Sequence, residues 1–192
     1  MKSVLPVMLL VAMAACGAAA ATAILAAEPP SHPAAAQEPA KKEEATLVGP
    51  ATREQIEGAA PEWVEAEVGA KPDADAAKAL AGVPPGAEVT IFLGTWCGDS
   101  RREVPRFWKA LDAAGAAVPF TVRYVAVDRQ KKEPAGAVAE DNVRYLPTFI
   151  VRRGGHEAGR IVETSPKGIE SDLLALLNGS AHGVLSTRTD LK

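Results

Sequence analysis

Two short apolar runs with a helical pattern between them constrain the fold of this chain most strongly. Residues 88–94 and 120–128 are rich in β-branched residues and are bounded by glycine, proline or aspartate, which indicates strands. Four apolar residues between them recur at the spacing of one face of an amphipathic helix: Val104, Phe107, Trp108 and Leu111. They predict a helix over 100–114, and a strand–helix–strand crossover makes its two strands parallel. The sequence therefore predicts a parallel βαβ unit.

Shorter elements are predicted on both sides of this unit. A capping-box pattern at Thr52 introduces a region in which we expect two small helices. Residues 148–151 and 160–162 flank a Gly-Gly turn as a hairpin, and a last helix is expected to begin at Pro166. The predicted fold class is α/β, with a central mixed β-sheet of about four strands flanked by helices.

The sequence ahead of these elements divides into an apolar leader and a polar stretch. No charged residue lies between Lys2 and Glu28, and residues 4–15 have the length and flank of the apolar core of a secretory signal. The stretch that follows mixes Pro, Ala and charged residues without an apolar period, which is typical of a flexible linker. We expect four segments along the chain: a signal peptide or lipoprotein leader or anchor over 1–27, a flexible linker over 28–50, a folded domain over 51–180 and a C-terminal tail over 181–192.

The leader is compatible with three fates. Residues 13–16 (Met-Ala-Ala-Cys) resemble a bacterial lipobox, which makes Cys16 a candidate for lipidation. Residues 21–23 offer an ordinary small-x-small cleavage site, and the uncharged run over 3–27 is long enough to span a bilayer uncut. Each fate predicts export. The expected location is the periplasmic side of a bacterial cell envelope, as a membrane-tethered lipoprotein or a secreted protein, where disulfides can form.

Composition excludes several classes of function. The chain has 21 Lys and Arg against 24 Asp and Glu, a net charge of −3, which argues against a nucleic-acid partner. Its two cysteines, Cys16 and Cys97, and its three scattered histidines are too few for a disulfide framework or a four-ligand zinc site. We therefore expect neither a metal nor another cofactor.

Cys97 is the residue whose position indicates chemistry. It lies between the first strand and the helix, where unpaired backbone N–H groups and the helix dipole stabilise a thiolate. Arg101 and Arg102 add positive potential there, and Asp99 opposes it. A buried, unreactive thiol is the alternative. The neighbouring Trp96 and the helix entrance favour a reactive thiol.

Three motifs follow one another along the chain: Trp96-Cys97-Gly98-Asp99-Ser100, then Pro105, then residues 143–148 (Val-Arg-Tyr-Leu-Pro-Thr) followed by Gly154-Gly155. Together, over roughly residues 88–179, they resemble the thioredoxin-like family. The first motif is similar to that family's Trp-Cys-Gly-Pro-Cys loop, and Pro105 to the proline that kinks its active-site helix. Pro147 corresponds to its cis-proline. The resemblance implies a thioredoxin-like fold and thiol–disulfide exchange at Cys97.

Two positions depart from the family's pattern. Ser100 stands where the family's resolving cysteine sits, and Ile91 stands where its members often carry a buried acid. A serine hydroxyl cannot attack a mixed disulfide and release the partner. The sequence therefore predicts a monothiol (CxxS) site in which Cys97 forms mixed disulfides and an outside thiol releases them, since Cys16 is removed, lipidated or tethered far away.

The residues around Cys97 keep alternative interpretations. Ser100 either caps the helix, because Ser100-x-x-Glu103 fits a capping box, or donates a hydrogen bond to the Cys97 thiolate. Trp96 is expected to shield the thiol and offer a flat apolar contact. Leu146 and Pro147 are expected to present backbone groups to a partner strand, with an ordinary trans Pro147 as the alternative.

The leading hypothesis is an exported, membrane-tethered protein with one redox-active cysteine, Cys97. Its partners would be protein thiols or disulfides, or a small thiol such as glutathione. The alternative is a non-catalytic binding module of the same fold, in which Trp96 and Leu146-Pro147 dock a partner chain. A third possibility is an oxidant sensor, in which the same thiolate forms a sulfenic acid.

Overall fold

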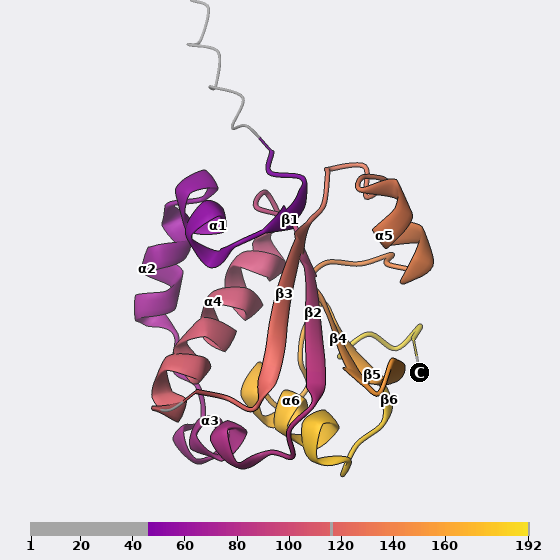
Figure 1. Cartoon of the computed structure of the whole chain (residues 1–192). Coiled ribbons are helices and arrows are strands. Elements are labelled where there is room, and N and C mark those ends of the chain that lie inside the picture. The colour runs from indigo at the N-terminus through magenta and orange to yellow at the C-terminus, as the bar shows by residue number, and fades with distance from the viewer. Residues whose placement is uncertain (1–45, 116, 192) are drawn as a thin grey trace, which may run out of the picture. The chain divides into compact units, whose positions relative to one another are not determined.

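A computed structural model describes residues 46–115 and 117–191 (Figure 1). The predicted leader over 1–27, with Cys16, lies outside the described residues, as does the predicted linker as far as residue 45. Within the two described ranges, none of the helices has the length and apolar character needed to cross a membrane.

The described residues fold around a six-stranded mixed sheet with the strand order β1-β3-β2-β4-β5-β6. The strands are β1 (Gly49–Ala51), β2 (Ala87–Leu93), β3 (Phe120–Ala126), β4 (Thr148–Arg153), β5 (His156–Val162) and β6 (Gly183–Leu185). Strands β2 and β3 are parallel and are joined by α4 (Gly98–Ala114), which confirms the predicted βαβ unit. Strand β4 runs antiparallel to β2, and β4 and β5 form the predicted hairpin.

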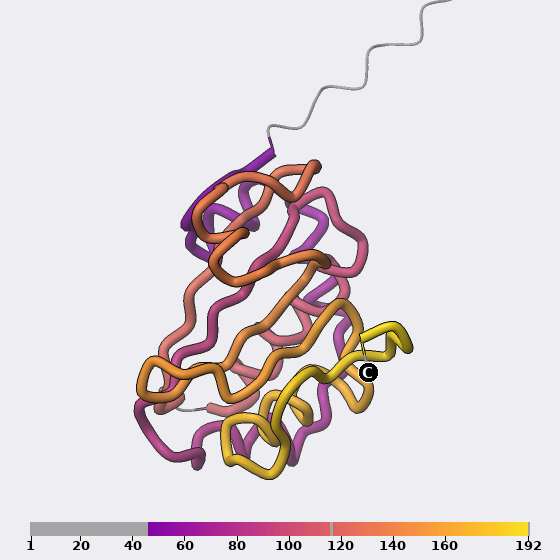
Figure 2. Tube along the Cα trace, turned by 90° about the vertical axis from the view of Figure 1, so that its right-hand side faces the viewer, coloured from indigo at the N-terminus to yellow at the C-terminus, as the bar shows by residue number. Residues whose placement is uncertain are grey.

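The expectation of about four strands is wrong, because two very short edge strands complete the sheet. Strand β1 pairs antiparallel with β3, and β6 pairs parallel with β5. Each begins with a glycine at positive φ, Gly49 at 98° and Gly183 at 75°. At three residues each, they are too short to show the alternation that marks a half-buried strand. Strand β1 takes in residues 49–50 of the predicted linker, and β6 lies in the predicted tail, which returns alongside β5 (Figure 2).

The helices follow the predicted pattern with shifted boundaries. Besides α4 they are α1 (Arg53–Ala59), α2 (Glu62–Gly69), α3 (Ala74–Ala79), the short 3₁₀ turn η1 (Leu80–Gly82), α5 (Ala135–Glu140) and α6 (Ile169–Asn178). The capping box at Thr52 is present. Between residue 46 and β2 there are three α-helices instead of the expected two, since Pro61 disfavours a helical conformation of the residue before it. Helix α6 begins three residues after Pro166, because Gly168 has a φ of 95° and ends the preceding loop.

Apolar side chains are buried on both faces of the sheet. Strand β2 shows the alternation, since Ile91 and Leu93 belong to the larger core cluster and Phe92 belongs to the smaller one. Helices α1 to α4 and α6 contribute to the larger cluster, and α5 contributes Val138 to the smaller one. The smaller cluster consists of Phe92, Val127, Val138, Val143, Leu146 and Ile150. It lies beneath the residues that the sequence singles out for chemistry, because Trp96 and Cys97 pack against it.

The register of β2 with β4 brings these residues together. Phe92, near the carboxyl end of β2, pairs with Thr148 at the start of β4. The chain leaves β2 toward Cys97 and enters β4 from Leu146, so antiparallel pairing places both at the same end of the two strands. Residues far apart in the sequence thus form one site.

Candidate active site

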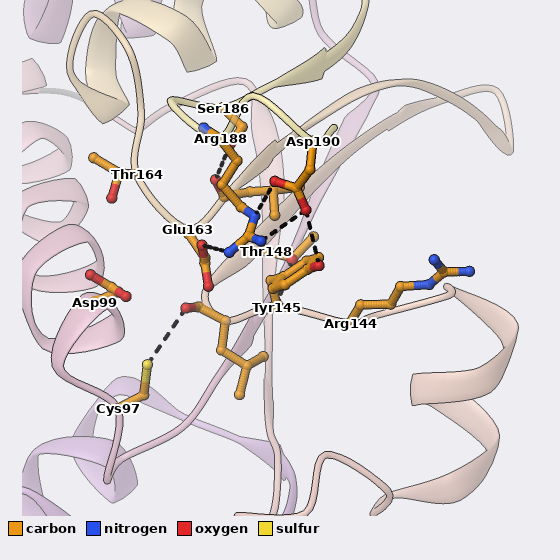
Figure 3. Close-up of polar contacts among 12 residues, drawn as sticks. Cys97, Asp99, Arg144, Tyr145, Thr148, Glu163, Thr164, Ser186, Arg188 and Asp190 are labelled. Atoms are coloured by element: carbon orange, nitrogen blue, oxygen red, sulfur yellow. Dashed lines mark hydrogen bonds and ion pairs between the residues drawn. The ribbon is translucent and has the colours of Figure 1, made fainter. Parts of the chain in front are cut away.

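Cys97 lies at the N-terminus of α4, as predicted. It is the N-cap residue, with φ −92° and ψ 124°, and its side chain caps no backbone group of the helix. Its backbone N–H donates to the carbonyl of Gly94 at 2.9 Å. The half-buried thiol Sγ donates a hydrogen bond to the carbonyl oxygen of Leu146 at 3.5 Å (Figure 3). The first turn of a 17-residue helix, with its unpaired N–H groups, therefore lies beside the sulfur.

Ser100 is a buried residue in the first turn of α4. Because α4 begins at Gly98, Ser100 lies inside the helix, and the interpretation of Ser100 as N-cap is wrong. Its side chain is fully buried, and its Oγ accepts a hydrogen bond from the N–H of Gly94 at 3.2 Å. Within the described residues, no hydrogen bond joins Ser100 Oγ to Cys97 Sγ. The hydroxyl stabilises the turn that presents the cysteine.

Trp96 is held in the fold by its ring and its indole nitrogen. Nε1 donates to the carbonyl of Val127 at 3.0 Å, and the ring packs against the smaller core cluster that Cys97 also contacts. A Cβ on Gly94 would lie 2.7 Å from the Trp96 ring, so the position of the ring requires glycine there. On the solvent side, the guanidinium carbon of Arg129 lies 5.5 Å from the ring centroid. Trp96 therefore connects the turn before α4 with the segment after β3.

The segment ahead of β4 is anchored through its carbonyl groups. The Leu146–Pro147 peptide bond is cis, as the family resemblance implies, and both residues are buried. Three consecutive carbonyls accept hydrogen bonds: Tyr145 from Thr148 Oγ1 at 2.8 Å, Leu146 from Cys97 Sγ at 3.5 Å and Pro147 from the Glu163 N–H at 2.8 Å. The Leu146 carbonyl is thus the group that connects this segment directly to the Cys97 thiol.

The charged residues after Cys97 largely pair with one another. Asp99 and Arg102 form an ion pair at 2.8 Å, and Arg102 also bonds Glu103 at 3.0 Å. Burial raises the pKa of the Glu103 carboxyl, and Arg102 opposes that effect. Arg101 is exposed and lines a surface depression of about 550 Å³ beside α2, together with Lys71. The positive potential expected from Arg102 is therefore partly neutralised by its own acidic partners.

A second cluster adjoins the segment ahead of β4, and we call it the C-terminal clamp: Tyr145, Glu163, Arg188 and Asp190. The guanidinium carbon of Arg188 lies 4.0 Å from the centroid of the Tyr145 ring. Its nitrogens bond Glu163 at 3.0 Å and Asp190 at 2.8 and 2.9 Å (Figure 3). These bonds raise the pKa of Arg188 and lower that of Asp190. The clamp joins the tail to the loops on either side of the β4–β5 hairpin.

The sequence motifs do not predict the C-terminal clamp. Tyr145 directly precedes Leu146, so its place next to the cis-proline segment could have indicated that it belongs to the site. Arg188 lies in a tail that has no apolar period, and nothing in the local sequence indicates its contacts with Tyr145 and Glu163.

Similarity to known proteins agrees with this geometry. A thioredoxin-like protein of Acanthamoeba polyphaga mimivirus is 27% identical over 100 residues, which cover 52% of this chain and 69% of that protein. Thioredoxin H2-1 of Oryza sativa subsp. japonica is 30% identical over 99 residues, which cover 52% of this chain and 67% of that protein. No protein-family model matches the chain.

Among solved structures, thioredoxin O2 from Arabidopsis thaliana in its oxidized state aligns at 22% identity with a TM-score of 0.37, covering 55% of this chain and 84% of that one. With the α/β sheet, the cis Leu146–Pro147 bond and Cys97 at the start of α4 in place, the two sequence relatives define the class. The chain belongs to the thioredoxin-like family.

Proposed function

We propose that this chain exchanges thiols and disulfides through Cys97 alone. Membership of the thioredoxin-like family supports a thiol–disulfide redox role in general. The observation that carries the monothiol mechanism is the pairing of a half-buried free Cys97 with a fully buried Ser100. Ser100 occupies the position from which a second thiol would attack, and its oxygen is engaged by Gly94.

The reaction is an exchange of one disulfide for another. The Cys97 thiolate attacks one sulfur of a partner disulfide, a bond forms between Cys97 and that sulfur, and the partner's own S–S bond breaks. The departing sulfur leaves as a thiolate and takes a proton. Because Ser100 cannot displace the bound sulfur, an outside thiolate attacks the partner sulfur of the mixed disulfide. A disulfide forms between the outside thiol and the partner, and Cys97 leaves as a free thiolate.

The Leu146 carbonyl couples this reaction to partner binding. In the free protein it accepts the Cys97 S–H at 3.5 Å. Once the thiol ionises, and in the mixed disulfide that then forms, Cys97 has no proton to donate, and the carbonyl lacks that donor. A backbone N–H of an extended partner segment is the natural replacement, since pairing of this kind satisfies a carbonyl at a sheet end.

We also propose partners and a location for this protein. Protein thiols and disulfides are the partners that the family assignment supports, and reduced glutathione is a candidate for the outside thiol. The predicted leader over 1–27 and its lipobox-like Cys16 support export to the periplasmic side of a cell envelope with a membrane tether. Fractionation of the full chain tests this. Release of a soluble form by Cys16→Ser supports lipidation, and unchanged membrane retention favours an uncut anchor.

Turnover on insulin tests the monothiol mechanism. With NADPH and a disulfide reductase as the electron supply, but no added small thiol, the wild-type full chain should reduce insulin at no more than about a tenth of the rate of Ser100→Cys, because the variant restores a resolving thiol. Ser100→Ala is the matched control, since it removes the oxygen without adding a thiol. Robust wild-type turnover without a small thiol would contradict the monothiol mechanism.

A further inference from the structure

The segment between β3 and β4 carries four cations, two of which lie against aromatic residues of the candidate site. We call these residues the basic surface: Arg129, Lys131, Lys132 and Arg144. Three of the four side chains are exposed, and Lys131 is half-buried. Among the described residues, none of the four forms an ion pair with a carboxylate. The whole chain has a net charge of −3, so these unpaired cations are a local feature.

Two of these cations lie against the aromatic residues that border Cys97 and Leu146. The guanidinium carbon of Arg129 lies 5.5 Å from the centroid of the Trp96 ring, and Lys131 Nζ lies 5.9 Å from that of the Tyr145 ring. Lys131 Nζ also donates to the carbonyl of Arg144 at 3.4 Å. Figure 3 shows the Arg144 side chain directed away from Cys97 and from the C-terminal clamp. The basic surface therefore begins at the residues beside the thiol and extends outward.

The loop's own carboxylates are occupied by its backbone. Asp128 accepts hydrogen bonds from the N–H groups of Lys132 at 2.6 Å, Glu133 at 2.8 Å and Gln130 at 3.2 Å. Glu133 accepts one from the N–H of Ala135 at 2.9 Å. Lys131 has a φ of 57°, a conformation that residues other than glycine rarely adopt. The backbone thus engages both carboxylates, and neither forms an ion pair with the cations of the basic surface.

We propose that the basic surface docks an acidic segment of a partner protein, next to the partner sulfur that reacts with Cys97; the inference rests on the function proposed above. Residues 128–144 contain four cations and four carboxylates. Three of the carboxylates are engaged, Asp128 and Glu133 by backbone N–H groups and Asp141 by Arg152, whereas no carboxylate among the described residues pairs with any of the four cations. The exposed cations therefore attract a segment rich in Asp or Glu more than one rich in Lys. Recognition by charge beside the thiol gives selectivity to a site that has a single reactive sulfur. The covalent step is the exchange described above.

The test uses short peptides whose central cysteine is activated as a pyridyl disulfide. One peptide has Glu around the cysteine, a second has Lys and a third has Gln. Cys97 attacks the peptide sulfur, the Cys97–peptide S–S bond forms, and the pyridine-2-thione that leaves is followed by absorbance. The protein is the full chain with Cys16→Ser, so that Cys97 is its single thiol. Each rate is divided by the rate of the same peptide with a small neutral thiol, which removes the peptide's intrinsic reactivity.

The wild-type surface should favour the acidic peptide over the lysine peptide by about tenfold at low ionic strength, and the ratio should fall toward one as salt screens the charges. The double variant Lys132→Gln/Arg144→Gln, which keeps the two cations that contact aromatic rings, should lower the ratio at least threefold. The matched control Lys78→Gln/Lys109→Gln removes two cations from α3 and α4 and should keep the wild-type ratio.

Other outcomes separate the docking proposal from the proposed function. Equal rates with the acidic and lysine peptides at low salt would overturn the docking proposal and leave exchange at Cys97 intact. If both double variants lost the preference for the acidic peptide equally, the docking proposal would also be overturned, because the preference would then depend on the net charge of the protein and not on the basic surface. If no peptide forms a Cys97 disulfide while iodoacetamide still labels Cys97, the proposed function fails and the docking proposal fails with it.

Discussion

Two groups of charged side chains border the segment that leads into β4, and they use their charges differently. In the C-terminal clamp, Arg188 is saturated by Glu163 and Asp190. In the basic surface, Arg129 and Lys131 lie over aromatic rings and have no carboxylate partner among the described residues. The first group is paired within the chain and holds the segment in place. The second is unpaired and is available to a partner.

Tyr145 is the point at which the two groups meet. Arg188 Cζ lies 4.0 Å from its ring centroid and Lys131 Nζ lies 5.9 Å from it. Tyr145 directly precedes Leu146, whose carbonyl oxygen accepts a hydrogen bond from the Cys97 thiol. Changes on either side should therefore affect exchange with peptides more than reactions of Cys97 with small reagents. This difference separates positioning of a partner from reactivity of the thiol.

The largest expected effect follows from Gly94→Ala, which disturbs Trp96, the aromatic residue that Arg129 of the basic surface contacts. The new Cβ would lie 2.7 Å from the Trp96 ring, so the ring must move and its bond to Val127 weakens. We expect a loss of about 1–3 kcal/mol in the free energy of unfolding, measured by urea denaturation. Gly58→Ala is the matched control, because a Cβ there meets nothing within 4 Å in helix α1, and it should be neutral or stabilising. Equal effects of the two substitutions would contradict the assigned contact.

The next largest effect is expected for Arg188→Ala, which breaks the clamp. It leaves Glu163 and Asp190 without their cation and uncovers Tyr145, so the segment that carries Leu146 is less well positioned. Exchange with a peptide disulfide should slow by roughly tenfold, while iodoacetamide labelling of Cys97 stays unchanged. Arg188→Lys should give an intermediate rate, since lysine keeps the charge but not the forked contact.

Arg123→Ala is the control for this experiment. Arg123 lies on β3 and forms a single ion pair, with Glu88 at 3.1 Å, and its side chain is 70% exposed. It should leave both rates unchanged. Parallel losses of peptide exchange and of iodoacetamide labelling in Arg188→Ala would show a general loss of structure and would contradict the positioning role.

The smallest effect concerns the pH dependence of the loop that carries the basic surface. Hydrogen bonds from backbone N–H groups, above all that of Glu133, hold the pKa of Asp128 below its usual value. A lowered carboxyl pKa contributes stability above the unfolded value, about 3.9, and this is lost as pH falls through the folded value. Hydrogen exchange at the Lys132 and Glu133 amides should therefore show weaker protection below about pH 4, by roughly threefold. Asp128→Asn should show the weaker protection at neutral pH; protection unchanged by pH and by the variant would contradict this role.

The parts of the molecule that the sequence predicts well depend on local patterns. The apolar spacing over 100–114, the β-branched runs that flank it and the capping box at Thr52 each require only neighbouring residues, and all are present in the structure. The cis Leu146–Pro147 bond is implied by a family motif and is also present. The position of Cys97 at the start of α4 follows from the same local order of elements.

The remaining parts depend on contacts between distant residues. The start of α4 at Gly98 changes Ser100 from a cap to a buried side chain, and helix termini are uncertain by one or two residues in any sequence pattern. Strands β1 and β6 exist because β3 and β5 offer unpaired edges to short segments. The contact of Arg188 with Tyr145 forms only when the tail returns along β5, which no pattern in residues 181–192 indicates.

The most direct test of a single-cysteine exchange site is the end product of one reaction. The full chain with Cys16→Ser is mixed with a symmetric peptide disulfide without reductant, quenched with an alkylating agent and weighed by mass spectrometry. A Cys97–peptide mixed disulfide should accumulate, persist until reduced glutathione is added, and be absent in Cys97→Ala. In Ser100→Cys the adduct should resolve to an internal disulfide. A Cys97 that iodoacetamide labels but that forms no adduct with any peptide disulfide would contradict exchange at this site and favour a non-catalytic binding module.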